Sequence, residues 1–335
     1  MLWRNFYIQM LITTHISRIL VANAMLTSML FEGYRGEHNI FKFSHWTKEL
    51  YFYILANFHG SNAMNVIEET LIFYNYPLAF NPAKAKLALE EKGLKYTEKQ
   101  IDLFNGQSLE PWYMRLNPHG WSPTLVTGKE ILTESLDIIR WVDRQGSSLG
   151  GNTANKTFVS EWLSKVDAWD GNLFAMCNSN AGGMFKYVTK FKIKVAQSHA
   201  TRNVDMSDLY MKKIANMNKV LEEVDDAAVV EANKMQLVAL LDEAEMRLGK
   251  SRYLAGNQYT IADVIFTPVV YRLFSTKKDQ QYLTTRSNIR QYYEELKQRP
   301  SYNKVFHVSD SGLSAASLIL PTLIKIFFIN LIKRY

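Results

Sequence analysis

Cysteine is nearly absent from the sequence. One residue, Cys177, occurs among 335, so neither an intramolecular disulfide nor a zinc site built from cysteines can form. Cys177 follows the apolar run 173–176, a context typical of a buried thiol rather than of a nucleophile. A reducing compartment fits this composition. We therefore expect a cytoplasmic protein without a metal centre.

The sequence also lacks a dense block of basic residues. Its 39 lysines and arginines are dispersed among 32 aspartates and glutamates, which leaves a net charge of +7. Nucleic-acid binding is therefore disfavoured. Apolar residues make up 47 % of the chain and aromatic residues 13 %, enough for a substantial hydrophobic core. The length predicts two packed domains with additional terminal segments.

Residues 1–69 contain neither a signal-type apolar stretch with a cleavage pattern nor a strict periodicity. A secretory signal is therefore not expected. Two interpretations of this extension are left open. It is either a weak organellar targeting segment, or upstream sequence that precedes a translation start at Met64.

The C-terminal segment 313–335 contains an almost wholly apolar stretch, residues 315–332, interrupted by Pro321 and Lys325 among others. A membrane span needs about 20 apolar residues, and a charge at its middle costs about 3 kcal/mol. Two interpretations are open for this helix. It either contacts a membrane, lying on the surface or anchoring the chain, or packs on its own domain or on a partner.

Residues 70–146 alternate between strand and helix signals. A strand-like run begins at Leu71 and stops before Pro77, and a helical pattern then runs from about Asn81 to Gly93. A second strand is predicted from Tyr96 to Leu103. A short helix follows over residues 109–116 and is broken by Asn117 and Pro118.

Pro123 opens a predicted β-hairpin. Its two strands are residues 124–127 and 130–132, joined by a turn at Gly128 and Lys129. A helix with apolar residues at helical spacing follows over residues 134–142. The resulting order βαβαββα predicts a thioredoxin-like domain, with a sheet of about four strands covered by helices.

The remainder of the chain, residues 153–310, reads as all helix after a Gly/Ser/Asn-rich linker. Within it, residues 178–233 are long, polar and basic. We interpret them as an insertion that is partly helical and partly mobile, with its lysines on a solvated face. Farther on, Thr260 and Asp263 have the spacing of a reciprocal capping box, and replacing either by alanine should cost about 1 kcal/mol or more.

Several of these motifs together resemble the glutathione transferases over roughly Leu71 to Val308. The resemblance lies in residues 87–93 and 116–118, the proline-led hairpin, the Glu134-Ser135 pair and residues 253–263. It is strongest to the plant class named for tetrachlorohydroquinone dehalogenase. The ganglioside-induced differentiation proteins, which also have inserts and an apolar tail, are a second relative. The resemblance implies an α/β thioredoxin-like N-terminal domain followed by the all-α C-terminal domain of a glutathione transferase.

The resemblance assigns glutathione-binding roles to residues that match the family pattern. Glu134 and Ser135 would hold the γ-glutamyl group, with the ligand ammonium on Glu134 and its carboxylate at the start of a helix. Ser122, before a cis Pro123, would present its backbone to the cysteinyl part. On spacing alone, Glu134 and Ser135 would be a plain helix cap, but their place after the hairpin favours the ligand.

The activating serine of the plant relatives has no counterpart here. Ala79 occupies the aligned position, where the family hydroxyl would stabilise the glutathione thiolate. Tyr74 and Tyr76 are candidate substitutes, as is the side-chain amide of Asn81. Strand packing is an alternative role for Tyr74, and helix capping is the alternative for Asn81.

A second departure is Trp121, which stands where the resemblance places a lysine that meets the glycyl carboxylate of glutathione. Trp121 is nevertheless counted among the glutathione-binding positions. His119 and Lys84 are candidate sources of the missing cation, and spacing does not decide between them.

The resemblance implies a glutathione transferase that activates the glutathione thiol as the nucleophile against an electrophilic, apolar substrate. Conjugation and dehalogenation share this opening step, and both suit a role in detoxification. A homodimer is implied by the resemblance alone. The alternative is a non-catalytic binding protein with the same fold, or a membrane-associated adaptor.

Overall fold

The computed structural model describes residues 71–152, 154–333 and 335. Both interpretations of residues 1–69 lie outside this range. The described residues form one compact unit that holds the sheet and the helices around it.

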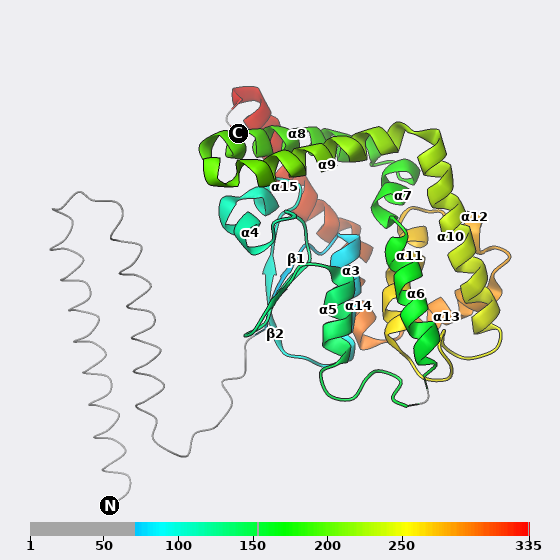
Figure 1. Ribbon diagram of the computed structural model, residues 1–335. Helices are drawn as coiled ribbons and strands as arrows, with labels where there is room; N and C mark the ends of the chain where they lie inside the picture. The colour runs from blue at the N-terminus through cyan, green and yellow to red at the C-terminus, as the bar shows by residue number, and fades with distance from the viewer. Residues whose placement is uncertain (1–70, 153, 334) are drawn as a thin grey trace, which may run out of the picture. The chain divides into compact units, whose positions relative to one another are not determined.

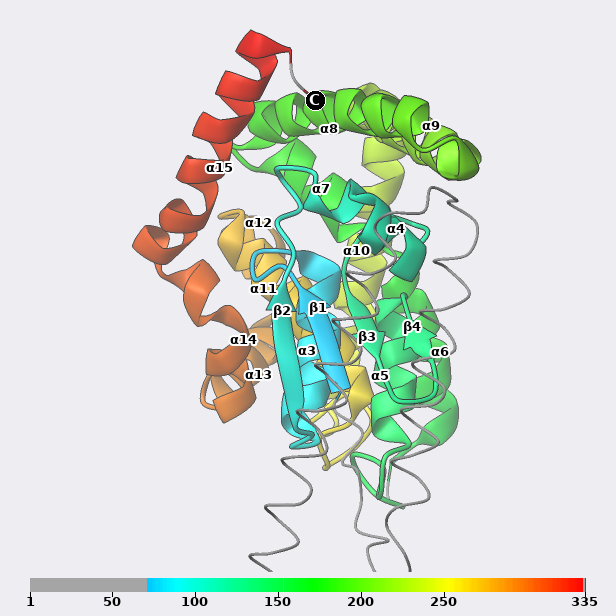
Figure 2. The same cartoon turned by 90° about the vertical axis from the view of Figure 1, so that its left-hand side faces the viewer.

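A four-stranded sheet forms the first part of the described chain, in the order β2-β1-β3-β4 (Figure 2). Its strands are β1 (Leu71–Asn75), β2 (Tyr96–Gln100), β3 (Thr124–Val126) and β4 (Ile131–Leu132). β1 and β2 are parallel, and the other neighbours are antiparallel. This confirms the predicted thioredoxin-like order. β2 ends earlier than predicted because the carboxylate of Asp102 accepts the backbone N–H groups of Phe104 and Asn105 and turns the chain.

Helices α3 (Phe80–Glu91) and α5 (Ser135–Asp143) pack against each other and against one face of the sheet. Phe73 and Leu125 from the strands are fully buried with Ile138 from α5. The short helix predicted over 109–116 is a 3-10 turn, η1 (Gln107–Leu109), followed by α4 (Pro111–Leu116).

The remainder is helical, as predicted. Its elements around the main core are α6 (Lys156–Ala168), α7 (Gly171–Asn178), α10 (Ala227–Leu248), α11 (Ile261–Ser275), α12 (Asp279–Leu283), α13 (Ser287–Lys297) and α14 (Pro300–Asp310). α11 is buried along most of its length and packs against both α3 and α6 (Figure 1). The sheet and the helical part therefore share one hydrophobic core.

The predicted capping box is present at the start of α11. The carboxylate of Asp263 accepts the backbone N–H of Thr260 at 2.8 Å, and the Thr260 hydroxyl accepts the N–H of Ala262 at 3.2 Å. Both donors would otherwise lack a partner at the first turn of this buried helix.

The inserted segment consists of two long antiparallel helices, α8 (Gly182–Arg202) and α9 (Ser207–Asp225), which run side by side (Figures 1 and 2). It is thus more regular than predicted. An apolar stripe on each helix, including Phe191 and Ile214, forms a second core with Leu109 and Met114. The solvated-face interpretation holds for the exposed Lys190 and Lys194, whereas Lys192 is only partly exposed.

The last helix, α15 (Gly312–Ile332), follows α14 and packs one side against α8 (Figure 2). Ile326 and Thr322 are buried there, Leu323 and Ile329 pack partly against the second core, and seven other large apolar side chains are exposed. The exposed set comprises Leu313, Leu320, Ile324, Phe327, Phe328, Leu331 and Ile332. By length and composition this helix could cross a membrane, although core helices and signal sequences can satisfy the same criteria.

Candidate functional site

Glu134 and Ser135 lie at the start of α5, directly after the hairpin. Glu134 is the N-cap residue, but its carboxylate accepts no capping hydrogen bond, and the side chain is about half exposed. Partial burial raises the pKa of Glu134, and the nearby Asp167 and Asp137 add to this effect. The plain helix-cap interpretation therefore loses its support, and the carboxylate is available to a cationic ligand.

The loop before this helix presents an extended backbone segment. The Ser122–Pro123 peptide bond is cis, as the resemblance implies. The loop is fixed by the carbonyl of Trp121, which accepts the Tyr113 hydroxyl at 2.8 Å and the Asn117 amide at 3.0 Å. Within the described chain, no hydrogen bond uses the backbone N–H or C=O of Ser122. These two groups can pair with an extended peptide-like ligand.

Trp121 links this loop to the start of α5. Its indole N–H donates to the carbonyl of Thr133 at 3.2 Å, and the ring of His119 stacks on it at 4.5 Å. His119 also places its Nε2 atom 3.8 Å from Glu134 Oε1. Loop, indole and carboxylate thus form one continuous surface.

The start of α3 carries the aligned position of the missing serine. Ala79 is the N-cap residue and supplies no side-chain cap. Asn81 lies in the first turn of α3 rather than at the cap, so the helix-capping interpretation of Asn81 is wrong. Its side chain has no hydrogen bond to another described residue.

The two candidate tyrosines are placed differently. The ring of Tyr74 packs against Trp112 and Tyr113, at centroid distances of 6.0 and 5.7 Å. Tyr76 is 2 % exposed, and its buried hydroxyl has no hydrogen-bond partner among the described residues. Burial raises the pKa of Tyr76, and the nearby carboxylate of Asp102 raises it further. A phenol held in this way is poorly suited to meeting a solvent-borne ligand.

Lys84 does not reach the Trp121 loop. It is 1 % exposed, lies over the ring of Phe80 at 4.6 Å, and points toward Asp167 on α6, whose carboxylate is 3.5 Å away. Burial lowers the pKa of Lys84, while the carboxylate of Asp167 opposes the shift. Of the two candidate cations, only His119 lies beside Trp121.

A residue that sequence reasoning missed lies there as well. The ammonium of Lys213, on α9, is 5.2 Å from the centre of the Trp121 ring. The available signal was a charged residue within an apolar stripe, because Lys213 lies between Tyr210 and Met217 at helical spacing. Its nearness to Trp121 could not be read from a separation of 92 residues along the chain.

Comparison with known proteins matches two parts of this chain to one family. The model described as "Glutathione S-transferase, N-terminal domain" matches residues 81–145, and that described as "Glutathione S-transferase, C-terminal domain" matches residues 227–295. Helices α8 and α9 fall between the two matched regions.

Curated relatives agree with this match. Glutathione S-transferase TCHQD from Arabidopsis thaliana is 28% identical over 265 residues, which are 78% of this chain and 99% of the relative. Tetrachloro-P-hydroquinone reductive dehalogenase from Sphingobium chlorophenolicum is 26% identical, covering 68% of this chain and 92% of its own length. Human ganglioside-induced differentiation-associated protein 1-like 1 is 22% identical, covering 77% and 79%.

Solved structures share the fold. The beta-etherase LigF from Sphingobium sp. superposes with a TM-score of 0.55 at 19% identity, covering 71% of this chain and 99% of its own. Glutathione transferase F2 from Populus trichocarpa gives a TM-score of 0.53 at 23% identity, covering 72% and 100%. The described part of the chain thus has a thioredoxin-like domain and an all-helical domain in the arrangement of these enzymes.

Proposed function

We propose that the chain binds glutathione and activates its thiol to attack an electrophilic, apolar substrate, because two parts of it match the N- and C-terminal domain models of glutathione S-transferases. The observation that supports binding most directly is the half-exposed carboxylate of Glu134 at the start of α5, which makes no capping hydrogen bond. The free backbone groups of Ser122 support it independently.

Glu134 and Ser135 suit the γ-glutamyl end of glutathione. The ligand ammonium would pair with the carboxylate of Glu134, and the ligand carboxylate would meet the N–H of Ser135 at the positive end of the helix dipole. The cysteinyl backbone would pair with Ser122 as a neighbouring strand does. These contacts would hold the thiol near the first turn of α3.

Asn81 is the candidate that we favour for the sulfur. Its amide lies two residues after Ala79, has no other hydrogen bond among the described residues, and can donate an N–H to a thiolate. Such a donor favours the ionised thiol, which is the nucleophile. The thiolate would then form a bond to carbon while a leaving group such as a halide departs with the bonding electron pair.

Glu134→Gln is expected to weaken glutathione binding by about tenfold or more, because the neutral amide cannot pair with the ligand ammonium as a carboxylate does. Titration calorimetry with glutathione measures this change. Asp137→Asn is the matched control, since Asp137 is exposed on the same helix, and it should leave affinity unchanged. Absence of binding by the folded wild-type protein would reject the proposed function.

Asn81→Ala is expected to lower kcat/KM by about tenfold or more in a conjugation assay with a generic aryl halide. Removal of one hydrogen-bond donor to a negative charge in an active site has an effect of at least this size. The kinetic pKa of the bound thiol should rise in the same variant. Tyr74→Phe and Tyr76→Phe are the comparison variants, and we expect little change in either. A large loss in a Phe variant with normal turnover in Asn81→Ala would assign the donor to that tyrosine instead.

A second candidate function is that of a membrane-associated adaptor, with or without turnover. It is favoured by α15, which has seven large apolar side chains exposed from Leu313 to Ile332. In this proposal the protein is a cytoplasmic homodimer that contacts membranes through α15. We expect the full chain to float with lipid vesicles in a density gradient. A Phe327→Gln, Phe328→Gln variant should float less, because it removes two exposed apolar side chains. It leaves the buried Ile326 in place. The exposed Val204→Gln is the control, and equal flotation of all three proteins would exclude this role for α15.

A further inference from the structure

Lys213 is a buried cation without an anionic partner among the described residues. Lys213 is 9 % exposed, and its side chain makes no hydrogen bond or ion pair with another described residue. Burial, with a smaller contribution from the charge of Lys192, lowers the pKa of Lys213 to about 7. A buried ammonium is unfavourable unless an anion or several acceptors surround it. The described residues therefore leave this ammonium open to an anionic ligand.

The position of Lys213 identifies the ligand that would bring this anion. Its Nζ atom lies 5.2 Å from the centre of the Trp121 ring, and Trp121 directly precedes the free backbone of Ser122. The charge of Lys192 on α8 lowers the pKa of Lys213, and the charge of Asp102 raises the pKa of Lys192. A ligand lying along Ser122 would thus meet a positively charged region on the side of α8 and α9.

The opposite side of this surface has the opposite charge. Glu134 lies on this side, and its half-exposed carboxylate suits the ammonium of a γ-glutamyl group. Glutathione carries a second, free carboxylate at its glycyl end. An extended tripeptide spans roughly 10 Å, so its two charged ends are far enough apart to meet different groups of the protein.

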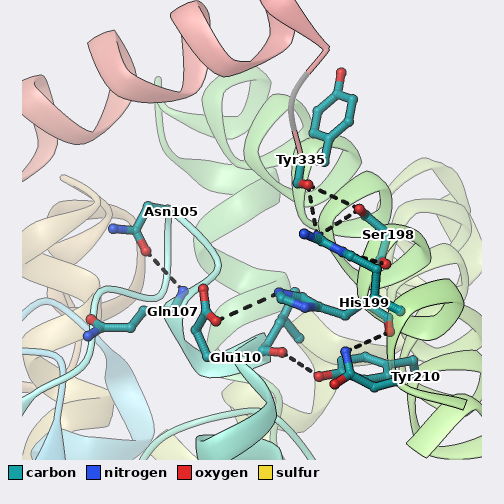
Figure 3. A network of polar contacts seen from close by, with 10 residues as sticks. Asn105, Gln107, Glu110, Ser198, His199, Tyr210 and Tyr335 are labelled. Atoms are coloured by element: carbon teal, nitrogen blue, oxygen red, sulfur yellow. Dashed lines mark hydrogen bonds and ion pairs between the residues drawn. The ribbon is translucent and has the colours of Figure 1, made fainter.

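The inserted helices are held firmly at this place (Figure 3). The Tyr210 hydroxyl, three residues before Lys213, donates to the carbonyl of Leu109 at 2.8 Å. The ring of His199 stacks on Tyr210 at 5.6 Å, and its Nε2 atom lies 4.0 Å from the carboxylate of Glu110. These contacts join α8 and α9 to η1 and to Glu110, the N-cap residue of α4. They therefore position the part of α9 that carries Lys213.

We propose that Lys213 binds the glycyl carboxylate of glutathione, so that the inserted helix α9 supplies the cation that Trp121 does not. This inference rests on the proposed glutathione binding. Its contact lies outside both matched family domains, because α9 falls between them. Lys213 is in this account a binding residue that selects the tripeptide over ligands without a glycyl carboxylate.

The test compares glutathione with γ-glutamylcysteine, which lacks the glycine, by titration calorimetry on the full chain. Wild-type protein should bind glutathione about tenfold or more tightly than the dipeptide, as expected for a charge-assisted contact. Lys213→Met should lose this preference while its affinity for the dipeptide stays unchanged. Lys212→Met is the control, since Lys212 is the exposed neighbour on the same helix, and it should keep the preference.

The outcomes separate this inference from the proposed function. Glutathione binding with no preference over the dipeptide, or a preference that survives in Lys213→Met, would overturn the role of Lys213 and leave glutathione binding intact. Absence of any binding by the wild-type protein would overturn both. Lys213→Gln, which keeps a polar side chain, serves as a second variant, and circular dichroism verifies that each variant is folded.

Discussion

Asp263→Ala is expected to lower the free energy of unfolding by about 3 to 5 kcal/mol, the range for removing one partner of a buried charged network. One carboxylate oxygen accepts the N–H of Leu254 at 3.0 Å and the hydroxyl of Tyr292 at 2.9 Å. The other accepts the N–H and the hydroxyl of Thr260, at 2.8 and 3.0 Å. Asp263 is fully buried, so alanine would leave these donors without water as a replacement partner.

Urea denaturation monitored by circular dichroism measures this loss. Asp226→Ala is the matched control, because Asp226 is an exposed N-cap residue that accepts two backbone N–H groups at the start of α10. Its removal should cost about 1 kcal/mol. Equal losses in the two variants would show that Asp263 acts as an ordinary helix cap and not as the centre of a buried network.

The sequence could predict the local part of this arrangement. Thr260 and Asp263 are three residues apart at the start of an apolar helix, and that spacing alone specifies a reciprocal cap. The same reasoning predicted the order of strands and helices, since each proline or glycine boundary acts on its own neighbours. The hydroxyl of Tyr292 on Asp263 could not be predicted in this way, because tertiary packing brings the two residues together.

The candidate site shows the same division. Glu134, Ser135 and the cis Ser122–Pro123 bond belong to one continuous segment, and the family pattern located them together. Lys213 belongs to a helix in a segment that we predicted to be partly mobile. Its place beside Trp121 follows from the packing of α8 and α9 on Leu109, a contact between distant parts of the chain.

Lys213→Met is expected to raise the free energy of unfolding at pH 6, by an amount on the order of 2 to 4 kcal/mol, in protein without ligand. At this pH the lysine is charged in both the folded and the unfolded chain, and only the folded chain buries it. Methionine has a similar length and fills the same apolar surroundings without an ammonium to desolvate. The variant should thus gain stability while it loses the preference for glutathione.

The pH dependence of this gain separates the charge from the packing. The pKa of Lys213 is lowered to about 7 in the folded chain, against about 10.4 when unfolded, so the folded form releases its proton first. Between these values the unfolded wild-type chain binds more protons, and wild-type stability rises with pH. The advantage of Lys213→Met should be largest below pH 7 and shrink by about 1.4 kcal/mol per pH unit above it. Lys192 and Asp102 remain in both proteins, so their direct contributions largely cancel in the difference. Urea denaturation at pH 6, 7, 8 and 9 measures this trend, and a gain that does not vary with pH would attribute it to packing alone.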